Sequence, residues 1–255
     1  MRWRRVLAKG VLCALMFVSG LVHAETLKVV LTPNSVPFSY RDERGELVGF
    51  NVDIVRALCA QLARSCQLET LPFPDILPAV AAGRFDLGVA NFLRTPERER
   101  LVAFTVPYWR SSSAFVGKRS FAMKAVQELL RDTPVCAIGA SVQYRYLIEQ
   151  AGEHTKHVRG LPSNQDVMEA LLSGQCPVAL LPSMQALPFM QSPRGMELTF
   201  LGAPLREAGL GGTVHMAVRP DDAALREAVD RALQHLIATG EHERIARRYF
   251  PFSIL

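Results

Sequence analysis

The residues whose types and spacing best suit a chemical role lie in the segment LRTPERERLVAFTVPYW, residues 93–109. Thr95 is a favourable helix N-cap and Pro96 a favourable first helical residue, so Arg98 is expected in the first helical turn. A cation there opposes the helix dipole, whereas a bound anion would be held jointly by the guanidinium and by free backbone N–H groups. Arg98 is therefore a candidate for binding a carboxylate, and a surface ion pair with Glu97 or a neighbouring acid is the alternative.

The other ionisable and metal-binding residue types form no comparable site. Arg94, Arg100 and Arg110 are interpreted as solvent-facing charges. The six histidines form no ligand cluster, and His154 and His157 lie in a predicted loop. The cysteines do not have zinc-site spacing with histidines, so the sequence predicts no metal and no cofactor.

The pattern of the first 24 residues predicts a secretory signal peptide, which would be cleaved after Ala24. They carry four of the 29 basic residues and no acid, followed by a short apolar core and the small-residue exit VHA. The core of about 12 residues is shorter than the ~20 of a membrane-spanning helix, so a membrane anchor is the less favoured alternative. The remaining 25 basic and 24 acidic residues give no support for a nucleic-acid partner. We expect an exported, periplasmic protein.

Four cysteines remain after this cleavage, and pairing is expected in an oxidising compartment. If Cys59 and Cys66 were both helical, they would lie ~10 Å apart along the axis, beyond the ~7 Å limit for a disulfide. A bridge between them therefore requires Cys66 to follow the helix end, and Cys136 and Cys176 would form the second bridge. Four buried free thiols are the alternative.

Hydrophobic periodicity predicts the elements that position Arg98. Segments 26–33, 66–73 and 85–92 are typical of strands, and apolar positions at helical spacing predict intervening helices at 51–65 and 75–83. This β-α-β-α-β order indicates a parallel sheet flanked by helices.

The pattern restarts after Tyr108 and predicts a second α/β unit. Its strands and helices are expected, in chain order, at 111–118, 125–132, 134–140, 142–152, 164–174 and 177–182. A strand at 212–220 and a helical segment at 221–250, broken at Gly240, follow. We predict an α/β fold of two lobes joined by short strand crossings, with a ligand site in the cleft between them. The GLGG run, 209–212, is interpreted as either a hinge element or a flexible loop.

Four segments give this sequence a resemblance to a known family. They are VPFSYRDERGELVGFNVDIVRAL, FPDILPAVAAGRFDLGVA, TPERERLVAFTVPYW and LIATGEHERIARRYF. Their order and spacing resemble the family 3 extracytoplasmic solute-binding proteins, the periplasmic receptors of polar amino acid ABC transporters, over residues 27–250. The resemblance implies a two-lobed periplasmic-binding-protein fold with two hinge strands, each lobe a mainly parallel sheet flanked by helices.

The resemblance also implies lobe limits and partners. Lobe 1 would comprise residues 25–109 and 214–255, and lobe 2 residues 110–213. The protein would close, as a monomer, on a small carboxylate-bearing solute and hand it to an ABC transporter permease. The cysteine pairs 59/66 and 136/176 resemble disulfides of basic-amino-acid receptors and of broader-specificity members, respectively.

In the family, the arginine of the TPER motif binds the α-carboxylate of the solute, and Arg98 matches it. Phe73 matches the aromatic residue before the second helix, and Ser141 matches the hydroxyl or glycine loop of lobe 2. Further contacts from lobe 1 are expected from the backbone at the end of the third strand, near Asn91, Phe92 and Leu93.

Three positions depart from the family pattern. Ser35 stands where an aromatic residue usually stacks on the solute, Leu93 removes a hydroxyl donor, and Pro182 replaces the aspartate that usually binds the α-ammonium. A buried ammonium without its partner costs ~3–5 kcal/mol, which corresponds to about two to three powers of ten in affinity. We expect a solute whose carboxylate has no neighbouring ammonium. The alternatives are a substitute acid, Asp75 or Glu207, or a shifted alignment at Pro182.

Two other functions are compatible with this fold. A sensory role would present the solute to a membrane partner instead of a permease. A cyclohexadienyl-dehydratase-like enzyme would need a proton donor in the cleft, and the sequence offers no convincing acid there. We therefore predict a receptor without catalytic residues.

Overall fold

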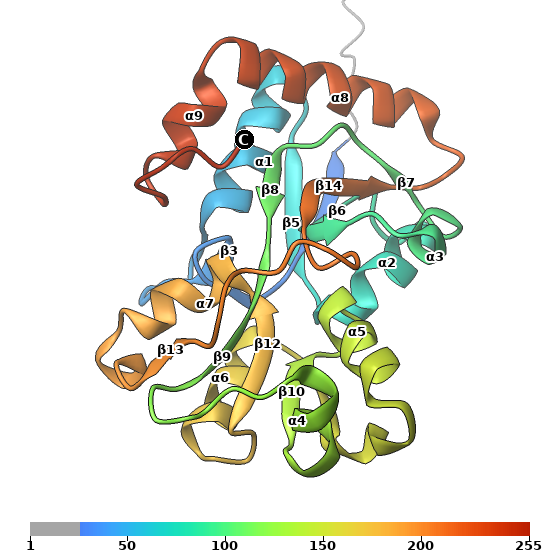
Figure 1. Cartoon of the computed structure of the whole chain (residues 1–255). Helices are drawn as coiled ribbons and strands as arrows, with labels where there is room; N and C mark the ends of the chain where they lie inside the picture. The colour runs from blue at the N-terminus through green and yellow to red at the C-terminus, as the bar shows by residue number, and fades with distance from the viewer. Residues whose placement is uncertain (1–25) are drawn as a thin grey trace, which may run out of the picture.

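Two lobes, one above the other in Figure 1, make up the computed structural model, which describes residues 26–255. The predicted signal peptide, residues 1–24, lies outside this part of the chain. Within residues 26–255, no helix combines the length and the apolar content needed to cross a bilayer.

The first lobe is built on a six-stranded sheet in the order β5-β1-β6-β14-β7, with β8 also paired to β14. Its strands are β1 (Leu27–Leu31), β5 (Cys66–Thr70), β6 (Leu87–Leu93), β7 (Ala103–Phe104), β8 (Trp109–Ser111) and β14 (Gly212–Val218). Strands β1, β5 and β6 are parallel, as predicted, and β14 is antiparallel to β6. A second, three-stranded sheet is formed by β2 (Asn34–Ser35), β3 (Ser39–Arg41) and β4 (Leu47–Val48).

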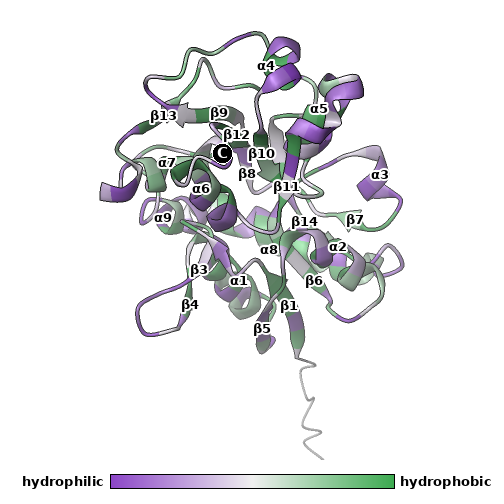
Figure 2. Cartoon of the chain, turned by 90° about the horizontal axis from the view of Figure 1, so that it is seen from below, coloured by the Kyte–Doolittle hydropathy of each residue, from purple (hydrophilic) through white to green (hydrophobic). Residues whose placement is uncertain are grey.

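Helices cover both faces of the large sheet because its strands bury alternate side chains on both sides. They are α1 (Phe50–Gln61), α2 (Phe73–Ala81), α8 (Ala223–Ala238) and α9 (Glu241–Ala246). The short α3 (Pro96–Glu99) has no buried residue. Val29 and Leu31 of β1 pack with α1 and α8, whereas Val30 packs with α2. Six of the seven residues of β6 are buried, as in a parallel strand with both faces covered. Figure 2 shows hydrophobic residues along the strands and hydrophilic residues on α3.

The second lobe has a five-stranded sheet in the order β11-β10-β12-β9-β13. Its strands are β9 (Ser113–Lys118), β10 (Val135–Ile138), β11 (Val158–Leu161), β12 (Val178–Pro182) and β13 (Leu198–Phe200). Its helices are α4 (Val126–Asp132), α5 (Val142–Ala151), α6 (Asn164–Leu172) and α7 (Ser183–Met190), with 3-10 segments η1 (Gly152–His157) and η2 (Pro193–Gly195). The three strands β10, β11 and β12 are parallel, and β9 and β13 are antiparallel to the strands beside them.

Two strands, one α-helix and both 3-10 segments of the second lobe were not predicted from the sequence. Strands β11 and β13 have four and three residues, too few for a periodic signal. Helix α7 contains Pro188, which normally argues against a helix interior. In addition, His154 and His157 lie in η1 and not in a loop.

The chain passes between the lobes along β8 and β14. In this ladder Arg110 pairs with Thr213, and Ser111 pairs with Gly212. Gly209 and Gly212 have φ values of 73° and 135°, so the GLGG run adopts backbone conformations that other residues rarely reach. The predicted lobe limits fall within this strand pair, and its role as a hinge stays a prediction.

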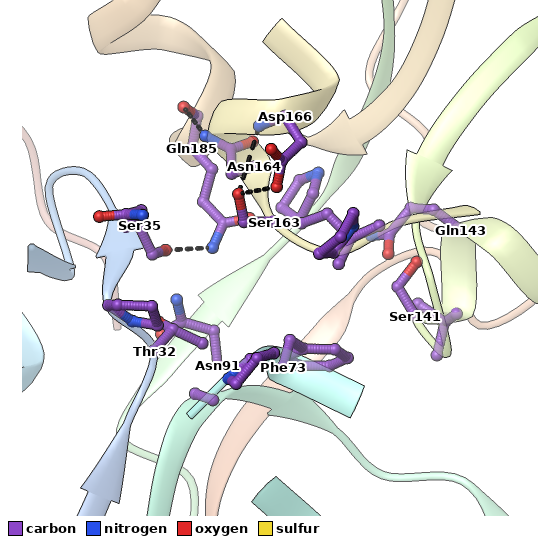
Figure 3. Close-up of a pocket in the computed structure, with 18 of the residues that line it drawn as sticks. Thr32, Ser35, Phe73, Asn91, Ser141, Gln143, Ser163, Asn164, Asp166 and Gln185 are labelled. Atoms are coloured by element: carbon purple, nitrogen blue, oxygen red, sulfur yellow. Dashed lines mark hydrogen bonds between the residues drawn. The ribbon is translucent and has the colours of Figure 1, made fainter. Parts of the chain in front are cut away.

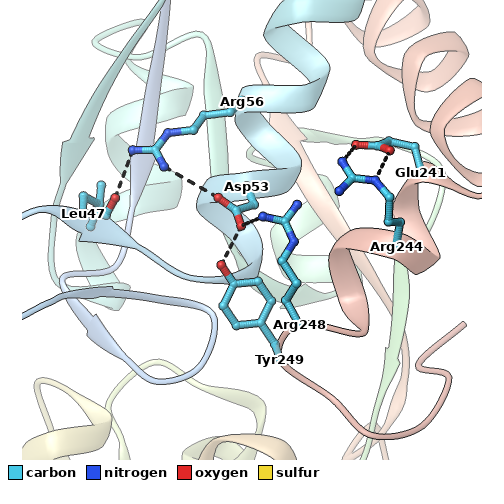
Figure 4. A network of polar contacts seen from close by, with 7 residues as sticks. All are labelled: Leu47, Asp53, Arg56, Glu241, Arg244, Arg248 and Tyr249. Carbon is cyan, nitrogen blue, oxygen red and sulfur yellow. Dashed lines mark hydrogen bonds and ion pairs between the residues drawn. The ribbon is translucent and has the colours of Figure 1, made fainter.

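The tail of the chain packs on the first lobe, where Asp53 of α1 holds it (Figure 4). The Asp53 carboxylate accepts hydrogen bonds from the Tyr249 hydroxyl (2.6 Å) and from Arg248 (3.0 Å). Burial and the nearby carboxylate raise the pKa of Tyr249. The Arg110 backbone N–H, on the crossing strand β8, donates to the Ile254 carbonyl (2.8 Å). The carboxyl-terminal residues are thereby attached next to the crossing.

Both predicted disulfides are confirmed. Cys59 pairs with Cys66 at a Cα–Cα distance of 6.1 Å, and Cys136 pairs with Cys176 at 5.8 Å. Helix α1 ends at Gln61, and Cys66 is the first residue of β5. The bridge therefore has the geometry that the sequence required of it.

Removal of the two disulfides is expected to have unequal effects on the free energy of unfolding. The pair 136/176 is separated by 40 residues and the pair 59/66 by seven. The chain-entropy relation then gives losses of ~4 and ~2 kcal/mol. Urea denaturation of the Cys136→Ala/Cys176→Ala and Cys59→Ala/Cys66→Ala double variants measures both losses. Equal losses, or the reverse order, would contradict this expectation.

Candidate ligand-binding site

A cavity of about 220 Å³ lies between the lobes, at the carboxyl ends of β1, β6, β10, β11 and β12. Side chains from both lobes surround it (Figure 3). Ligands bind at this edge of parallel strands in open α/β sheets. Seven of the eight predicted solute-binding residues line the cavity: Ser35, Phe73, Asn91, Leu93, Arg98, Ser141 and Pro182.

Phe92 is the exception among them, and the contact expected from the backbone near Asn91 to Leu93 stays a prediction. The side chain does not line the cavity and is completely buried. Because side chains alternate along β6, Phe92 packs in the cluster formed with α2. Its ring centroid lies 5.4 Å from that of Phe73 and 5.8 Å from the Arg98 guanidinium carbon. Phe92 therefore supports the site from behind.

Arg98 reaches from the first lobe to the second. Thr95 accepts a hydrogen bond from the Arg98 backbone N–H (3.3 Å), which confirms the predicted N-cap of α3. The guanidinium donates to the carbonyl oxygens of Leu93 (2.8 Å) and Ala140 (3.1 Å), one from each lobe. It also lies over the Phe73 ring, 5.5 Å from the centroid, a favourable cation–π position.

The charge of Arg98 is partly desolvated and forms no ion pair with an acidic side chain of the described residues. Burial lowers the pKa of Arg98 to about 10; the positive charge of Arg145 adds to this effect, and Glu97 opposes it. The guanidinium is still charged at neutral pH. Two of its five N–H donors are occupied by backbone carbonyls, so donors remain for a carboxylate.

Glu97 does not pair with Arg98, which was the alternative that the sequence left open. It forms an ion pair with Arg145 of α5 in the second lobe. Hydrogen bonds from its own backbone and from Thr95, followed by the contact with Arg145, lower the pKa of Glu97 to about 2. Both side chains are exposed, so the pair is a surface contact between the lobes that solvent screens.

Ser35 and Gln185 join the lobes on the other side of the cavity. The Gln185 Nε2 donates to the Ser35 Oγ at 2.6 Å, and both side chains are buried. Ser35 was noted as the place where an aromatic residue usually stacks on the solute. In this chain it accepts a hydrogen bond from the opposite lobe instead.

Asn91 shapes the end of β6. It has a φ of 61°, in the left-handed region, and its Oδ1 accepts from Asn51 Nδ2 (3.0 Å) and the Tyr108 hydroxyl (3.3 Å). Tyr108 also donates to Asn51 (3.0 Å), and burial raises its pKa. On the second lobe, Ser141 is held in place as the N-cap of α5, where its hydroxyl accepts a hydrogen bond from the Tyr144 N–H (3.0 Å).

Further polar residues line the cavity that the sequence did not single out: Asn164, Asp166 and Gln185. Asn164 and Asp166 begin α6, which was predicted, but its place at the cavity depends on β11, which was not. Gln185 belongs to α7, which was not predicted. The available signal was Ser163 followed three residues later by an acid. Ser163 accepts from the Asp166 N–H (3.2 Å) and donates to the Asp166 carboxylate (2.6 Å).

The acid lining this cavity is not one of the predicted substitutes. Asp75 and Glu207 do not line it, and Asp166 is its only acidic residue in the described part of the chain. Asp166 is exposed. Pro182 ends β12 and precedes α7, so no charge stands at the position of the expected aspartate.

Comparison with known proteins gives a family match over nearly the whole described chain. A model for "Bacterial extracellular solute-binding proteins, family 3" matches residues 27–252. The chain is 24% identical over 232 residues to the histidine-binding periplasmic protein of Escherichia coli (strain K12), covering 90% of this chain and 89% of that protein. It is 27% identical over 220 residues to the L-arginine-binding protein of Pseudomonas aeruginosa, covering 86% and 85%.

Solved structures share the same fold. An ancestral arginine-binding protein bound to arginine superposes with a TM-score of 0.83 at 24% identity, covering 89% of this chain and all of that chain. The two-lobed periplasmic-binding-protein fold expected from the sequence is thereby confirmed.

Replacing Ser35 by alanine is expected to open the lobes. With the lobes together, the buried Gln185 N–H would lose its acceptor at a cost of ~1–3 kcal/mol, whereas water can bind it when the lobes separate. Small-angle X-ray scattering should therefore give a larger radius of gyration for Ser35→Ala than for the wild type.

The matched control is Ser39→Ala, which removes a hydrogen bond to Thr32 (2.9 Å) within the first lobe. It should lower the stability and leave the radius of gyration unchanged. A Ser35→Ala protein as compact as the wild type would contradict the expectation.

Proposed function

We propose, from the premise that this chain belongs to the bacterial extracellular solute-binding proteins of family 3, that it closes on a small carboxylate-bearing solute and delivers it to an ABC importer. The relatives named above are a histidine-binding periplasmic protein and an L-arginine-binding protein, which supports the receptor role. Export by cleavage after Ala24, and action as a monomer, are parts of the same proposal.

The observation that carries the proposal is the unpaired guanidinium of Arg98. A partly buried cation is stabilised by an anion that brings charge and oxygen acceptors together. Arg98 has free donors, an aromatic ring beneath it and no acidic partner among residues 26–255. A carboxylate is the simplest solute group that completes this arrangement.

Closure follows from the position of the cavity. A solute that contacts both lobes favours the closed arrangement over the open one by its difference in affinity for the two. In this proposal, lobe 1 (residues 25–109 and 214–255) supplies Arg98 and Phe73. Lobe 2 (residues 110–213) supplies Ser141, and the β8–β14 crossing bends.

The solute need not be an ordinary amino acid. Free amino acids carry an ammonium beside the carboxylate, and Pro182 offers that group no charge. A dehydratase-like activity is not adopted, because it needs a positioned proton donor in the cleft. The acid at the cavity, Asp166, is exposed and hydrogen-bonded to Ser163.

The Arg98→Ala variant is expected to lose carboxylate binding. Removing one partner of a desolvated ion pair costs ~3–5 kcal/mol, a loss of about 100-fold or more in affinity. A thermal-shift screen of organic and amino acids identifies a carboxylate that binds the wild type, and calorimetry then compares the variants.

Arg100→Ala is the matched control, because Arg100 is exposed and two residues away. It should bind the same carboxylate as tightly as the wild type. Equal affinity of Arg98→Ala and the wild type would refute the assigned role of Arg98.

A further inference from the structure

Two residues of the second lobe that line the cavity carry uncharged amide groups. The family pattern places an aspartate in this lobe, at the position of Pro182. Asn164 and Gln185 are 8% and 7% exposed, and both line the cavity. Figure 3 shows them together above Ser35. Each has a buried carbonyl oxygen without a hydrogen-bond partner among the described residues, Asn164 Oδ1 and Gln185 Oε1.

The orientation of the Asn164 amide is fixed by its neighbour. Its Nδ2 donates to the backbone carbonyl of Gln185 (3.3 Å), and a carbonyl can only accept. The Oδ1 is therefore the atom left over, and it is a hydrogen-bond acceptor.

The Gln185 amide is held by the Ser35 hydroxyl of the first lobe. Its Nε2 donates to the Ser35 hydroxyl at 2.6 Å, which leaves Oε1 as the unpaired acceptor. Buried polar atoms without a partner destabilise a protein until a partner is supplied. Both residues line one cavity, and hydrogen-bond donors on a solute held there would supply the missing partners.

The charge of this region decides which donors fit. An ammonium in a desolvated site needs a carboxylate to balance its charge, and neither two amide oxygens nor Pro182 provides one. A hydroxyl or an amide N–H donates to the same oxygens and has no charge to balance. Asn164, Gln185 and Pro182 thus favour a neutral donor.

We infer that the solute is a carboxylate whose second polar group is an uncharged donor, a hydroxyl or an amide N–H, held by Asn164 Oδ1 and Gln185 Oε1. This inference rests on the proposed function, because Arg98 holds the carboxylate end. It makes Asn164 and Gln185 the residues that discriminate hydroxy acids and N-acylated acids from free amino acids.

Asp166 is the acid that could instead bind the ammonium of a free amino acid. It lies two residues after Asn164 and lines the same cavity. However, its carboxylate accepts from Ser163 at the start of α6 (2.6 Å) and is exposed. Water screens an exposed carboxylate, so Asp166 supports the N-cap Ser163 and is not the partner of an ammonium.

The test uses sets of carboxylic acids that share one carbon skeleton. Propanoate, 4-methylpentanoate, 3-phenylpropanoate and butanedioate are each compared as the unsubstituted, 2-hydroxy, 2-acetylamino and 2-amino forms. In every set that binds the wild type, calorimetry should show the hydroxy or acetylamino form binding at least about tenfold more tightly than the amino form.

The Gln185→Glu variant tests the assigned residue directly. It keeps the size of the side chain and can accept a hydrogen bond from Ser35, but it places a negative charge at the cavity. The preference should shift by about tenfold or more toward the amino form. Gln165→Glu is the matched control, because Gln165 is exposed and does not line the cavity, and it should leave the preference unchanged.

Two results would overturn the inference, and they are distinguishable. If the amino forms bind the wild type most tightly and lose this advantage in Asp166→Asn, the inference fails. The proposed function would still hold in that case, provided that Arg98→Ala abolishes binding. If no carboxylate of any set binds the wild type, both the inference and the proposed function fail.

Discussion

A cation that is partly withdrawn from water and has no acidic partner must be compensated by hydrogen bonds, by polarisable neighbours or by an incoming anion. Arg98 has the first two in the protein itself, from the carbonyl oxygens of Leu93 and Ala140 and from the Phe73 ring. Since those carbonyls belong to different lobes, the guanidinium depends on the lobes being together. The proposed function follows from this dependence.

The rest of the fold fixes the position of that guanidinium. The parallel strands of both sheets end at the same cavity, and Thr95 fixes the start of α3. Phe73 packs against hydrophobic clusters of both lobes, so it forms part of the floor of the site and of the contact between lobes. The hydrogen bond between Ser35 and Gln185 makes a second contact across the cavity.

Local sequence signals predicted those parts of the molecule that depend on local physics. The strand and helix periods, the Thr95 cap and the end of α1 before Cys66 were all readable, because each depends on a few neighbouring residues. The positions of Asn164 and Gln185 were not readable. They depend on β11, which is too short for a periodic pattern, and on α7, whose Pro188 hides its helical character. The burial of the Phe92 side chain was not readable either, because only the packing of β6 shows which of its faces meets α2.

The most direct measurement is a crystal structure of the protein with the carboxylate that gives the largest thermal shift. We expect the carboxylate oxygens to lie about 2.7–2.9 Å from the Arg98 guanidinium nitrogens, with the solute enclosed by both lobes. A bound molecule outside this cavity, or one whose carboxylate faces away while Arg98 extends into bulk water, would contradict it.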